Sequence, residues 1–229
     1  MSINIPLNIV SFYHNVNKMP EKMKLNYNKM VSDNPEFNCQ LYDVDDALEF
    51  IKYYYNIDVV NAFISLKPYA YKSDLFRYCY MYINGGIYID IKYECVNNFH
   101  FINLIDKEYL VSEPIGVQNC LLILKPNNQL IINCIKNIVE NAENKIIGSG
   151  PLLTGPKLLS EKYKELYNEE NKYIHTSLKW KMENHIQKIY LNDNLILKQY
   201  PEYREDLLKN SDQPHYNKLY NGGGIYIDL

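Results

Sequence analysis

The sequence predicts an α/β fold in which a sheet is flanked by helices. Short runs of β-branched and aromatic residues alternate with longer amphipathic segments, and proline or glycine marks many of the boundaries between them. A chain of 229 residues is long enough to bury a sizeable core. Because no stretch of disordered composition divides it, we expect one domain with short crossover connections over residues 1–229.

In the first half, strands and helices are expected to alternate. The expected elements are a strand over residues 5–13, a helix over 21–31, a strand over 37–42, a helix over 44–54, a connector over 61–66, a helix over 68–82 and a strand over 87–91. Pro20 suits a first helical turn, and Asp43 is a good cap for the helix that follows it. Gly85 and Gly86 stop the long helix.

The second half is expected to continue in the same way, with a polar, turn-rich tail from residue 201. The expected elements are strands over 109–111 and 121–124, a helix over 126–141, a Gly/Pro loop over 148–156, a helix over 157–167, and strands over 173–176 and 188–197.

Bulk composition excludes some classes of function. The formal net charge is −3, which gives no electrostatic footprint for nucleic acid. The five cysteines are widely spaced and mostly lie in apolar runs, which favours buried, reduced thiols. The N-terminal segment is too short and too interrupted to serve as a signal peptide or a membrane anchor. We therefore expect a soluble, cytoplasmic protein without an integral membrane segment.

Residues 71–92 (YKSDLFRYCYMYINGGIYIDIK) form the most informative stretch. On its helical part, Asp74 and Arg77 are neighbours one turn apart, while the rest of the helix is apolar on nearly every side. We expect both charges to be at least partly buried, so each needs a partner. A plain ion pair in the core would satisfy them, as would a ligand site.

The strand that follows favours the ligand site. At a period of two, residues 87, 89 and 91 face one way, and Tyr88, Asp90 and Lys92 face the other. Asp90 comes at the carboxyl end of this strand, where open α/β sheets bind ligands. The double glycine would let the backbone approach a ligand closely. Acid and base together suit a charged, hydroxyl-rich ligand.

This stretch resembles the glycosyltransferases with a sugar-binding DXD region, the family 32 type related to yeast Golgi mannosyltransferases and clostridial glucosylating toxins. The resemblance rests on Ser-Asp-x-x-Arg at 73–77 and Gly-Gly-x-Tyr-x-Asp at 85–90, and it extends in order to about residue 160. The ordered flanking matches are 5–13, Met19-Pro20-Glu21, Asn34-Pro35-Glu36-Phe37, Leu41-Tyr42-Asp43, Gln118-Asn119, Lys125-Pro126-Asn127 and Thr154-Gly155-Pro156.

The resemblance implies a GT-A fold and retaining transfer of a hexose from UDP-hexose or GDP-mannose to a glycan or another hydroxyl acceptor. Residues 1–112 would form the donor half and 113–229 the acceptor half. Asp74, Asp90 and Asn119 would be catalytic, Asn119 lying near the anomeric centre. The expected donor-binding residues are Phe12, Tyr13, Asp74, Arg77, Gly86, Asp90 and Lys92, with Tyr13 stacking on the base.

The chain departs from the family at one position, since Lys92 stands where the second aspartate of Asp-x-Asp is usual. We expect a divalent ion, Mn²⁺ or Mg²⁺, held by Asp90 with His215 as the late ligand and Glu94 as a possible contributor. Alternatively, Lys92 itself neutralises the diphosphate without a metal. The missing aspartate also leaves open a non-catalytic module that binds nucleotide-sugars or glycans.

The sequence leaves two interpretations open for each of three further features: Asn119, His215 and the 148–156 loop. Asn119 is either a site residue or a turn residue before a strand, and His215 either a ligand or a surface histidine. The 148–156 loop either lines the acceptor site or is a turn. The repeat of 84–90 (NGGIYID) at 221–228 lacks the preceding helix, so no second active site is assigned to it.

Overall fold

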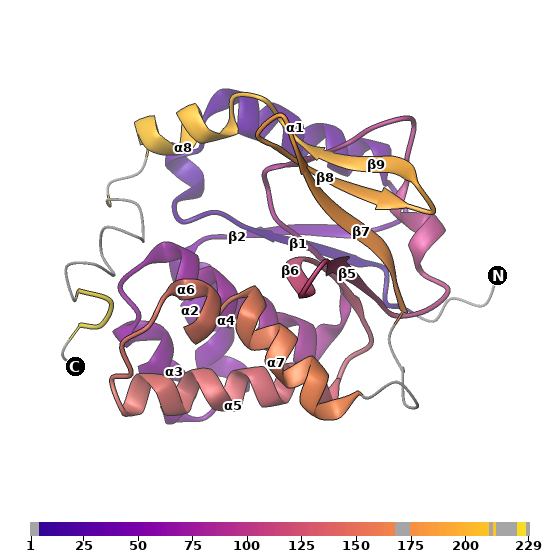
Figure 1. Cartoon of the computed structure of the whole chain (residues 1–229). Helices are drawn as coiled ribbons and strands as arrows, with labels where there is room; N and C mark the ends of the chain where they lie inside the picture. The colour runs from indigo at the N-terminus through magenta and orange to yellow at the C-terminus, as the bar shows by residue number, and fades with distance from the viewer. Residues whose placement is uncertain (1–4, 168–174, 211–212, 214–223, 228–229) are drawn as a thin grey trace.

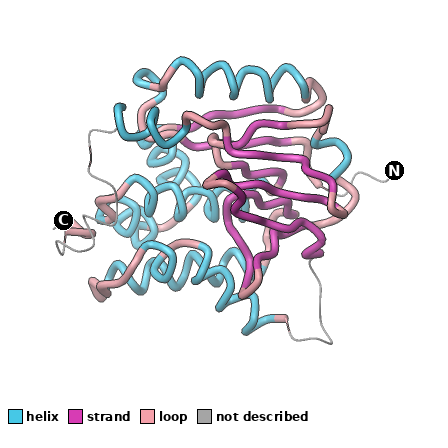
Figure 2. Tube along the Cα trace, turned by 45° about the horizontal axis from the view of Figure 1, so that its top comes forward, coloured by secondary structure: helices cyan, strands magenta, loops and turns pink. Residues whose placement is uncertain are grey.

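The structure is a computed structural model that describes residues 5–167, 175–210, 213 and 224–227. In this part of the chain a curled, mixed sheet of nine strands lies between helices, in the order β2-β1-β3-β6-β5-β7-β8-β9-β4 (Figures 1 and 2). The strands are β1 (Asn8–Phe12), β2 (Asn38–Tyr42), β3 (Gly86–Ile89), β4 (Tyr93–Cys95), β5 (Tyr109–Glu113), β6 (Gly116–Leu124), β7 (His175–Glu183), β8 (Ile186–Leu191) and β9 (Asn194–Gln199).

Figure 1 shows most helices on one side of the central strands and α1 and α8 on the other, together with β8 and β9. The helices are α1 (Glu21–Asp33), α2 (Val44–Tyr54), α3 (Ile57–Ser65), α4 (Tyr69–Asn84), α5 (Gln129–Glu143), α6 (Gly150–Leu153), α7 (Pro156–Leu166) and α8 (Tyr203–Asn210), with 3-10 turns η1 (Val16–Lys18) and η2 (Phe101–Leu104). The predicted α/β class, a sheet flanked by helices, is confirmed.

Successive side chains along a strand point to opposite faces of the sheet, and buried apolar side chains form a core on each face. Tyr88 packs with the helices α2 to α5, whereas Ile87 and Ile89 pack on the other face with residues of α1, η2 and the late strands. This is the period-two pattern expected for β3. The strand ends at Ile89, however, and Asp90 is the first residue of the turn that follows.

The double glycine is required by packing at the start of β3. Gly85 and Gly86 have φ values of +61° and +97°, which side chains other than glycine rarely adopt. A Cβ at Gly86 would lie 2.6 Å from the backbone oxygen of Asn8, and one at Gly85 would lie 2.7 Å from the nitrogen of Pro126. The glycines therefore allow β3 to pair closely with β1 and to turn beside the end of β6.

Several predicted elements were wrong in type or extent. The expected connector over 61–66 belongs to α3, whose buried Val59, Val60 and Phe63 override the weak helix propensity of β-branched residues. The single late strand is a hairpin of β8 and β9, turned at Asn192 and Asp193, which both have positive φ. The tail from residue 201 contains α8.

Candidate active site

The predicted charges meet at the carboxyl ends of β1 and β3, beneath α4. The parallel pairing of these strands brings the ends of both to one edge of the sheet. A cleft of about 690 Å³ opens there. Phe12, Tyr13, Asp74, Arg77, Asp90, Lys92 and Asn119 all line it. The volume is within the range of small-ligand pockets.

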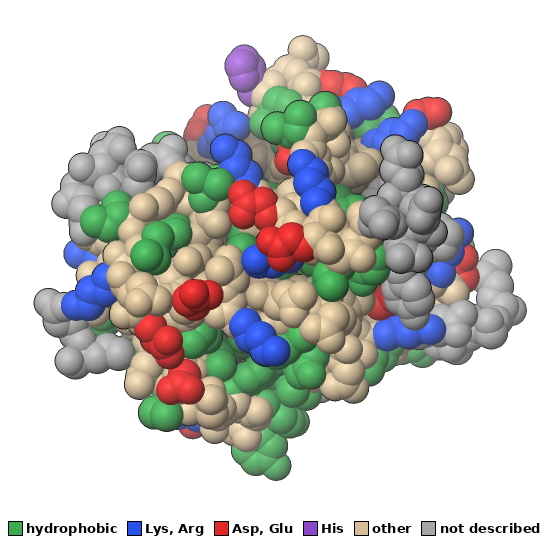
Figure 3. All heavy atoms as spheres, turned by 60° about the horizontal axis from the view of Figure 1, so that its bottom comes forward, with side chains coloured by type: hydrophobic (Ala, Val, Ile, Leu, Met, Phe, Trp, Pro, Cys, Tyr) green, Lys and Arg blue, Asp and Glu red, His purple; other side chains and the backbone are tan. Residues whose placement is uncertain are grey.

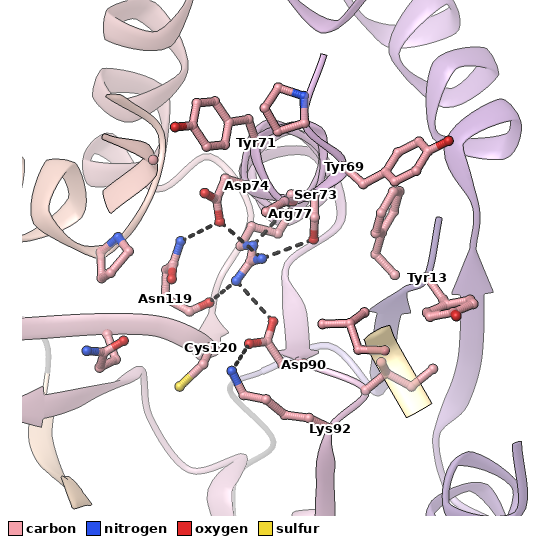
Figure 4. Close-up of a pocket in the computed structure, with 18 of the residues that line it drawn as sticks. Tyr13, Tyr69, Tyr71, Ser73, Asp74, Arg77, Asp90, Lys92, Asn119 and Cys120 are labelled. Atoms are coloured by element: carbon pink, nitrogen blue, oxygen red, sulfur yellow. Dashed lines mark hydrogen bonds and ion pairs between the residues drawn. The ribbon is translucent and has the colours of Figure 1, made fainter. Parts of the chain in front are cut away.

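Arg77 lies at the centre of the site and joins its two carboxylates (Figure 4). One terminal nitrogen, Nη2, lies 3.1 Å from Oδ1 of Asp74, and the other, Nη1, lies 3.1 Å from Oδ1 of Asp90. Nε donates to the Ser73 carbonyl, Nη2 to the Ser73 hydroxyl and Nη1 to the Asn119 carbonyl. These five contacts equal the five N–H donors of a guanidinium.

Asp74 is held by groups from three different parts of the chain. Its side chain accepts hydrogen bonds from Asn119 Nδ2 at 2.9 Å and from Thr154 Oγ1 at 2.8 Å, in addition to the pair with Arg77. The residue is only 8% exposed. Burial raises the pKa of Asp74, and Arg77 and Thr154 oppose this without cancelling it, so the pKa lies above its ordinary value.

The pKa of Asp90 is shifted in the opposite direction from that of Asp74. Burial would raise its pKa, but the Lys92 ammonium and the Arg77 guanidinium outweigh burial and hold the pKa below its ordinary value. Lys92 Nζ lies 2.8 Å from Oδ2, and the Tyr88 hydroxyl donates to Oδ1 at 3.1 Å. Asp90 raises the pKa of Lys92 above its ordinary value despite burial, so Lys92 is charged at neutral pH.

The surroundings of Asp90 do not fit a divalent ion. Both of its oxygens already face a cation, Arg77 on one side and Lys92 on the other. DXD sites generally use a divalent metal, with carboxylates that can face the ion. Among the described residues, no group of three or more His, Cys, Asp and Glu side chains is placed to hold a metal ion. His215, the expected second ligand, lies outside the described residues.

The structure also shows where Gly86, Asn119 and Glu94 lie. Gly86 lies at the opposite end of β3 from Asp90, packed against Asn8, and it is not among the cleft-lining residues. Asn119 lies within β6 and not in a turn before a strand, because β6 begins at Gly116. Glu94 points its carboxylate to Lys198, at 3.1 Å.

Aromatic residues form another part of the cleft lining. Tyr13 lies 4.4 Å from His14 between ring centroids, and His14 stacks on Tyr69 at 4.6 Å. Figure 4 shows Tyr13 and Tyr69 apart from the Asp74–Arg77–Asp90 network, on the other side of the close-up from Asn119. The base-stacking role of Tyr13 stays a prediction.

Several lining residues were missed from the sequence. Ser73 and Thr154 were noticed only as parts of longer matches, although each contacts a site charge. Trp180, the one tryptophan of the chain, lines the cleft from β7. The sequence gives one weak signal for Trp180 as a cleft residue: it is an isolated aromatic residue between lysines. Gly150, Pro151 and Pro156 line the cleft from the 148–156 segment.

On the face drawn in Figure 3, lysine and arginine side chains are scattered among acidic and uncharged ones. No basic stripe of the kind that binds nucleic acid forms on that face.

Within the described part of the chain, no helix combines the length and the apolar character needed to span a bilayer.

Comparison with known proteins finds similarity to glycosyltransferases. Residues 20–120 match the family described as "Glycosyltransferase sugar-binding region containing DXD motif". An uncharacterised glycosyltransferase of Acanthamoeba polyphaga mimivirus is 24% identical over 133 residues, which are 58% of this chain and 45% of that protein. This chain thus spans less than half of that relative's length.

The solved structure of the PaToxG glycosyltransferase is similar in fold, with a TM-score of 0.53 and 19% identity over 71% of this chain and 69% of that one. This likeness concerns the fold. Residues 20–120, with Asp74, Arg77 and Asp90 among them, are thus similar to the sugar-binding region of DXD-type glycosyltransferases, the resemblance that the sequence predicts.

Proposed function

We propose that this chain transfers a hexose from a nucleotide-sugar, UDP-hexose or GDP-mannose, to a hydroxyl of a glycan or another acceptor. The observation that carries the proposal is the buried network in which Arg77 joins Asp74 and Asp90 at the floor of the cleft. Burying charges costs free energy unless they are paired. This network of paired charges lies at the carboxyl ends of the strands, where α/β sheets bind ligands.

The reaction requires the bond between the sugar C1 and the diphosphate oxygen to break. The bonding electron pair leaves with the diphosphate, and the acceptor oxygen forms a new bond to C1 and loses its proton. Negative charge therefore grows on the diphosphate, and a preorganised positive group beside it lowers the barrier. In the proposed retaining reaction, the hexose keeps its anomeric configuration.

In this proposal, Asp74 accepts hydrogen bonds from the hydroxyls of the donor sugar, and Asn119 lies near the reacting carbon. Asn119 already donates to Asp74 at 2.9 Å, which orients its amide and the carboxylate together. Asp90 and Lys92 then face the ribose and diphosphate, and Tyr13 stacks on the base. Arg77 holds both carboxylates in position.

The proposed division into a donor half and an acceptor half agrees with the lining of the cleft. Phe12, Tyr13, Asp74 and Asp90 come from residues 1–112, and Pro151, Trp180 and Gln187 come from residues 113–229. We propose that the donor lies against the first group, and that the acceptor enters beside the second.

A thermal-shift panel of UDP, GDP and their hexose conjugates tests the binding half of the proposal. A ligand at one hundred times its Kd stabilises the fold by about 2.7 kcal/mol. In a chain of this size, that energy corresponds to a rise of about 5–10 °C in Tm. We expect one nucleotide family to give this rise, and Asp74→Asn to lower the gain from the hexose more than the gain from the bare diphosphate. No rise with any conjugate would contradict the proposal.

A further inference from the structure

We propose that Lys92 is the resident cation of this site, so that the chain binds its nucleoside diphosphate without a divalent ion. This inference rests on the proposed function and adds the group that neutralises the leaving diphosphate. It follows from three observations: the surroundings of Asp90, the net charge of the site and the placement of the Lys92 ammonium.

The first observation is that the carboxylate of Asp90 has no oxygen directed at an open site for a metal. Oδ1 faces Arg77 at 3.1 Å and accepts from Tyr88, and Oδ2 faces Lys92 at 2.8 Å. A divalent ion bound there would meet two positive side chains at close range, and the interaction would be repulsive at low dielectric.

Net charge is the second observation. An aspartate that binds a divalent ion contributes one negative and two positive charges, which together leave one positive charge. Lysine at the same position carries that same charge by itself. A site with Lys92 in place of the second aspartate of Asp-x-Asp therefore has the same net charge without a bound ion.

The third observation concerns where the ammonium group lies. Lys92 lines the cleft, and its side chain is only 14% exposed, so it is not a freely moving surface lysine. Figure 4 shows its Nζ directed at Asp90, within the cleft. Of the three N–H donors of an ammonium group, the ion pair with Asp90 uses one. A phosphate oxygen is a strong acceptor for the others.

The ion pair with Lys92 also gives Asp90 a role in a site without a metal ion. Asp90 would hold the lysine at one place in the cleft, as it would otherwise hold a metal ion. The pair is a preorganised positive group that needs no reorganisation when charge develops on the diphosphate.

Calorimetric titration of UDP and of GDP into the whole chain tests this directly. The protein is first stripped with EDTA, and each titration is repeated with Mn²⁺ and with Mg²⁺. We expect the stripped protein to bind one of the two diphosphates, and the added metal to change its Kd by less than about twofold. Binding that is lost on stripping and restored by Mn²⁺ or Mg²⁺ would overturn the inference, although the proposed function would stand.

Substitutions at Lys92 give a second, independent test. Lys92→Gln removes the charge and should weaken diphosphate binding about ten- to a hundredfold, the usual value of a charge-assisted hydrogen bond. Lys92→Arg keeps the charge and should retain binding within about fivefold. Unchanged binding in Lys92→Gln would overturn the inference.

Lys198→Gln is the matched control, because Lys198 pairs with Glu94 at 3.1 Å and does not line the cleft. We expect its Kd to stay within about twofold of the unaltered chain, and an equal loss in Lys198→Gln and Lys92→Gln would overturn the inference. If neither UDP nor GDP binds the unaltered chain, with metal or without, the proposed function itself fails.

Discussion

Arg77 organises the site at the scale of single residues. Its guanidinium makes three hydrogen bonds to Ser73 and Asn119 and two ion pairs, one with each carboxylate. Its guanidinium also lies 4.5 Å from the ring of Tyr88, a cation–π contact. The resemblance implied that Arg77 contacts the donor's hydroxyls. The geometry supports a positioning role, in which the two carboxylates that Arg77 fixes make those contacts.

Replacement of Arg77 by lysine should therefore damage the fold as well as binding. Lysine keeps the charge but cannot reach Asp74, Asp90 and the Asn119 carbonyl at once. We expect the free energy of unfolding in urea to fall by about 2–3 kcal/mol. Arg204→Lys on exposed α8 is the matched control and should change it by less than about 0.5 kcal/mol. Equal losses in the two variants would show that the network contributes nothing to stability.

The pKa values of the two aspartates should be shifted in opposite directions from the ordinary value. The pKa of Asp74 is raised by burial, and that of Asp90 is lowered by Lys92 and Arg77 in spite of burial. Carboxyl ¹³C NMR should show Asp74 protonating first as the pH falls, with Asp74→Asn and Asp90→Asn used for assignment. The reverse order would contradict the electrostatic description of the site.

The direction of each pKa shift determines how the ionisation of that aspartate changes the free energy of unfolding with pH. Asp90 contributes stability that is present above its unfolded pKa and is lost as the pH falls through its lower folded pKa. Asp74 has a folded pKa above its unfolded one, so its ionisation costs stability as the pH rises between the two. Unfolding free energies measured against pH should show the acid-side loss reduced in Asp90→Asn, but not in Asp74→Asn.

At the scale of elements, the junction between α4 and β3 positions the whole network. The helix supplies Ser73, Asp74 and Arg77, and the strand carries Tyr88 and leads directly to Asp90. The positive φ values of Gly85 and Gly86 make the reversal possible and bring β3 against β1. Since Gly86 does not line the cleft, we propose that the glycines act on the site through the fold.

Gly86→Ala should therefore destabilise the protein by about 2–4 kcal/mol, since the new Cβ meets backbone at 2.6 Å and φ is +97°. Gly148→Ala is the control, because the three atoms nearest to its Cβ would all belong to the Leu153 side chain, the first at 3.0 Å. We expect the control to lose less than about 1 kcal/mol in urea unfolding. A smaller loss for Gly86→Ala than for the control would contradict the packing role of Gly86.

Much of this site could be predicted from the sequence, and the reasons for the misses are physical. Asp74, Arg77 and Asp90 were found because their spacing places them on adjoining elements and their apolar neighbours imply burial. Thr154 is eighty residues from Asp74 in sequence, and no local pattern indicates that tertiary contact. The late hairpin was missed because Asn-Asp is a less familiar turn sequence than Asn-Gly, although both of its residues adopt the positive φ that the turn needs.

At the scale of the whole molecule, one sheet connects the proposed donor half with the proposed acceptor half. β3 pairs with β6, β6 with β5 and β5 with β7, so strands from both sides share hydrogen bonds. The cleft lies at an edge of this sheet and is lined from both sides. We therefore propose that residues 1–229 unfold as one cooperative unit.

The single tryptophan allows this to be tested. Trp180 lies in β7, on the acceptor side, whereas far-UV circular dichroism reports mostly on the helices. The urea midpoints from the two signals should coincide, and Gly86→Ala on the donor side should shift both equally. Separate midpoints would show two units in place of one domain.

We propose that Asp74, Arg77 and Asp90 form a site that breaks the bond between a hexose and a nucleoside diphosphate. The most direct measurement follows the anomeric proton of UDP-glucose or GDP-mannose by ¹H NMR in the presence of the chain. With water as the acceptor, we expect one donor to decay slowly into free hexose and nucleoside diphosphate. We expect the decay to stop in Asp74→Asn and Asp90→Asn, each shown by circular dichroism to be folded. Equal decay in the unaltered chain and both variants would contradict the claim, and a donor that binds but never decays would indicate a binding module.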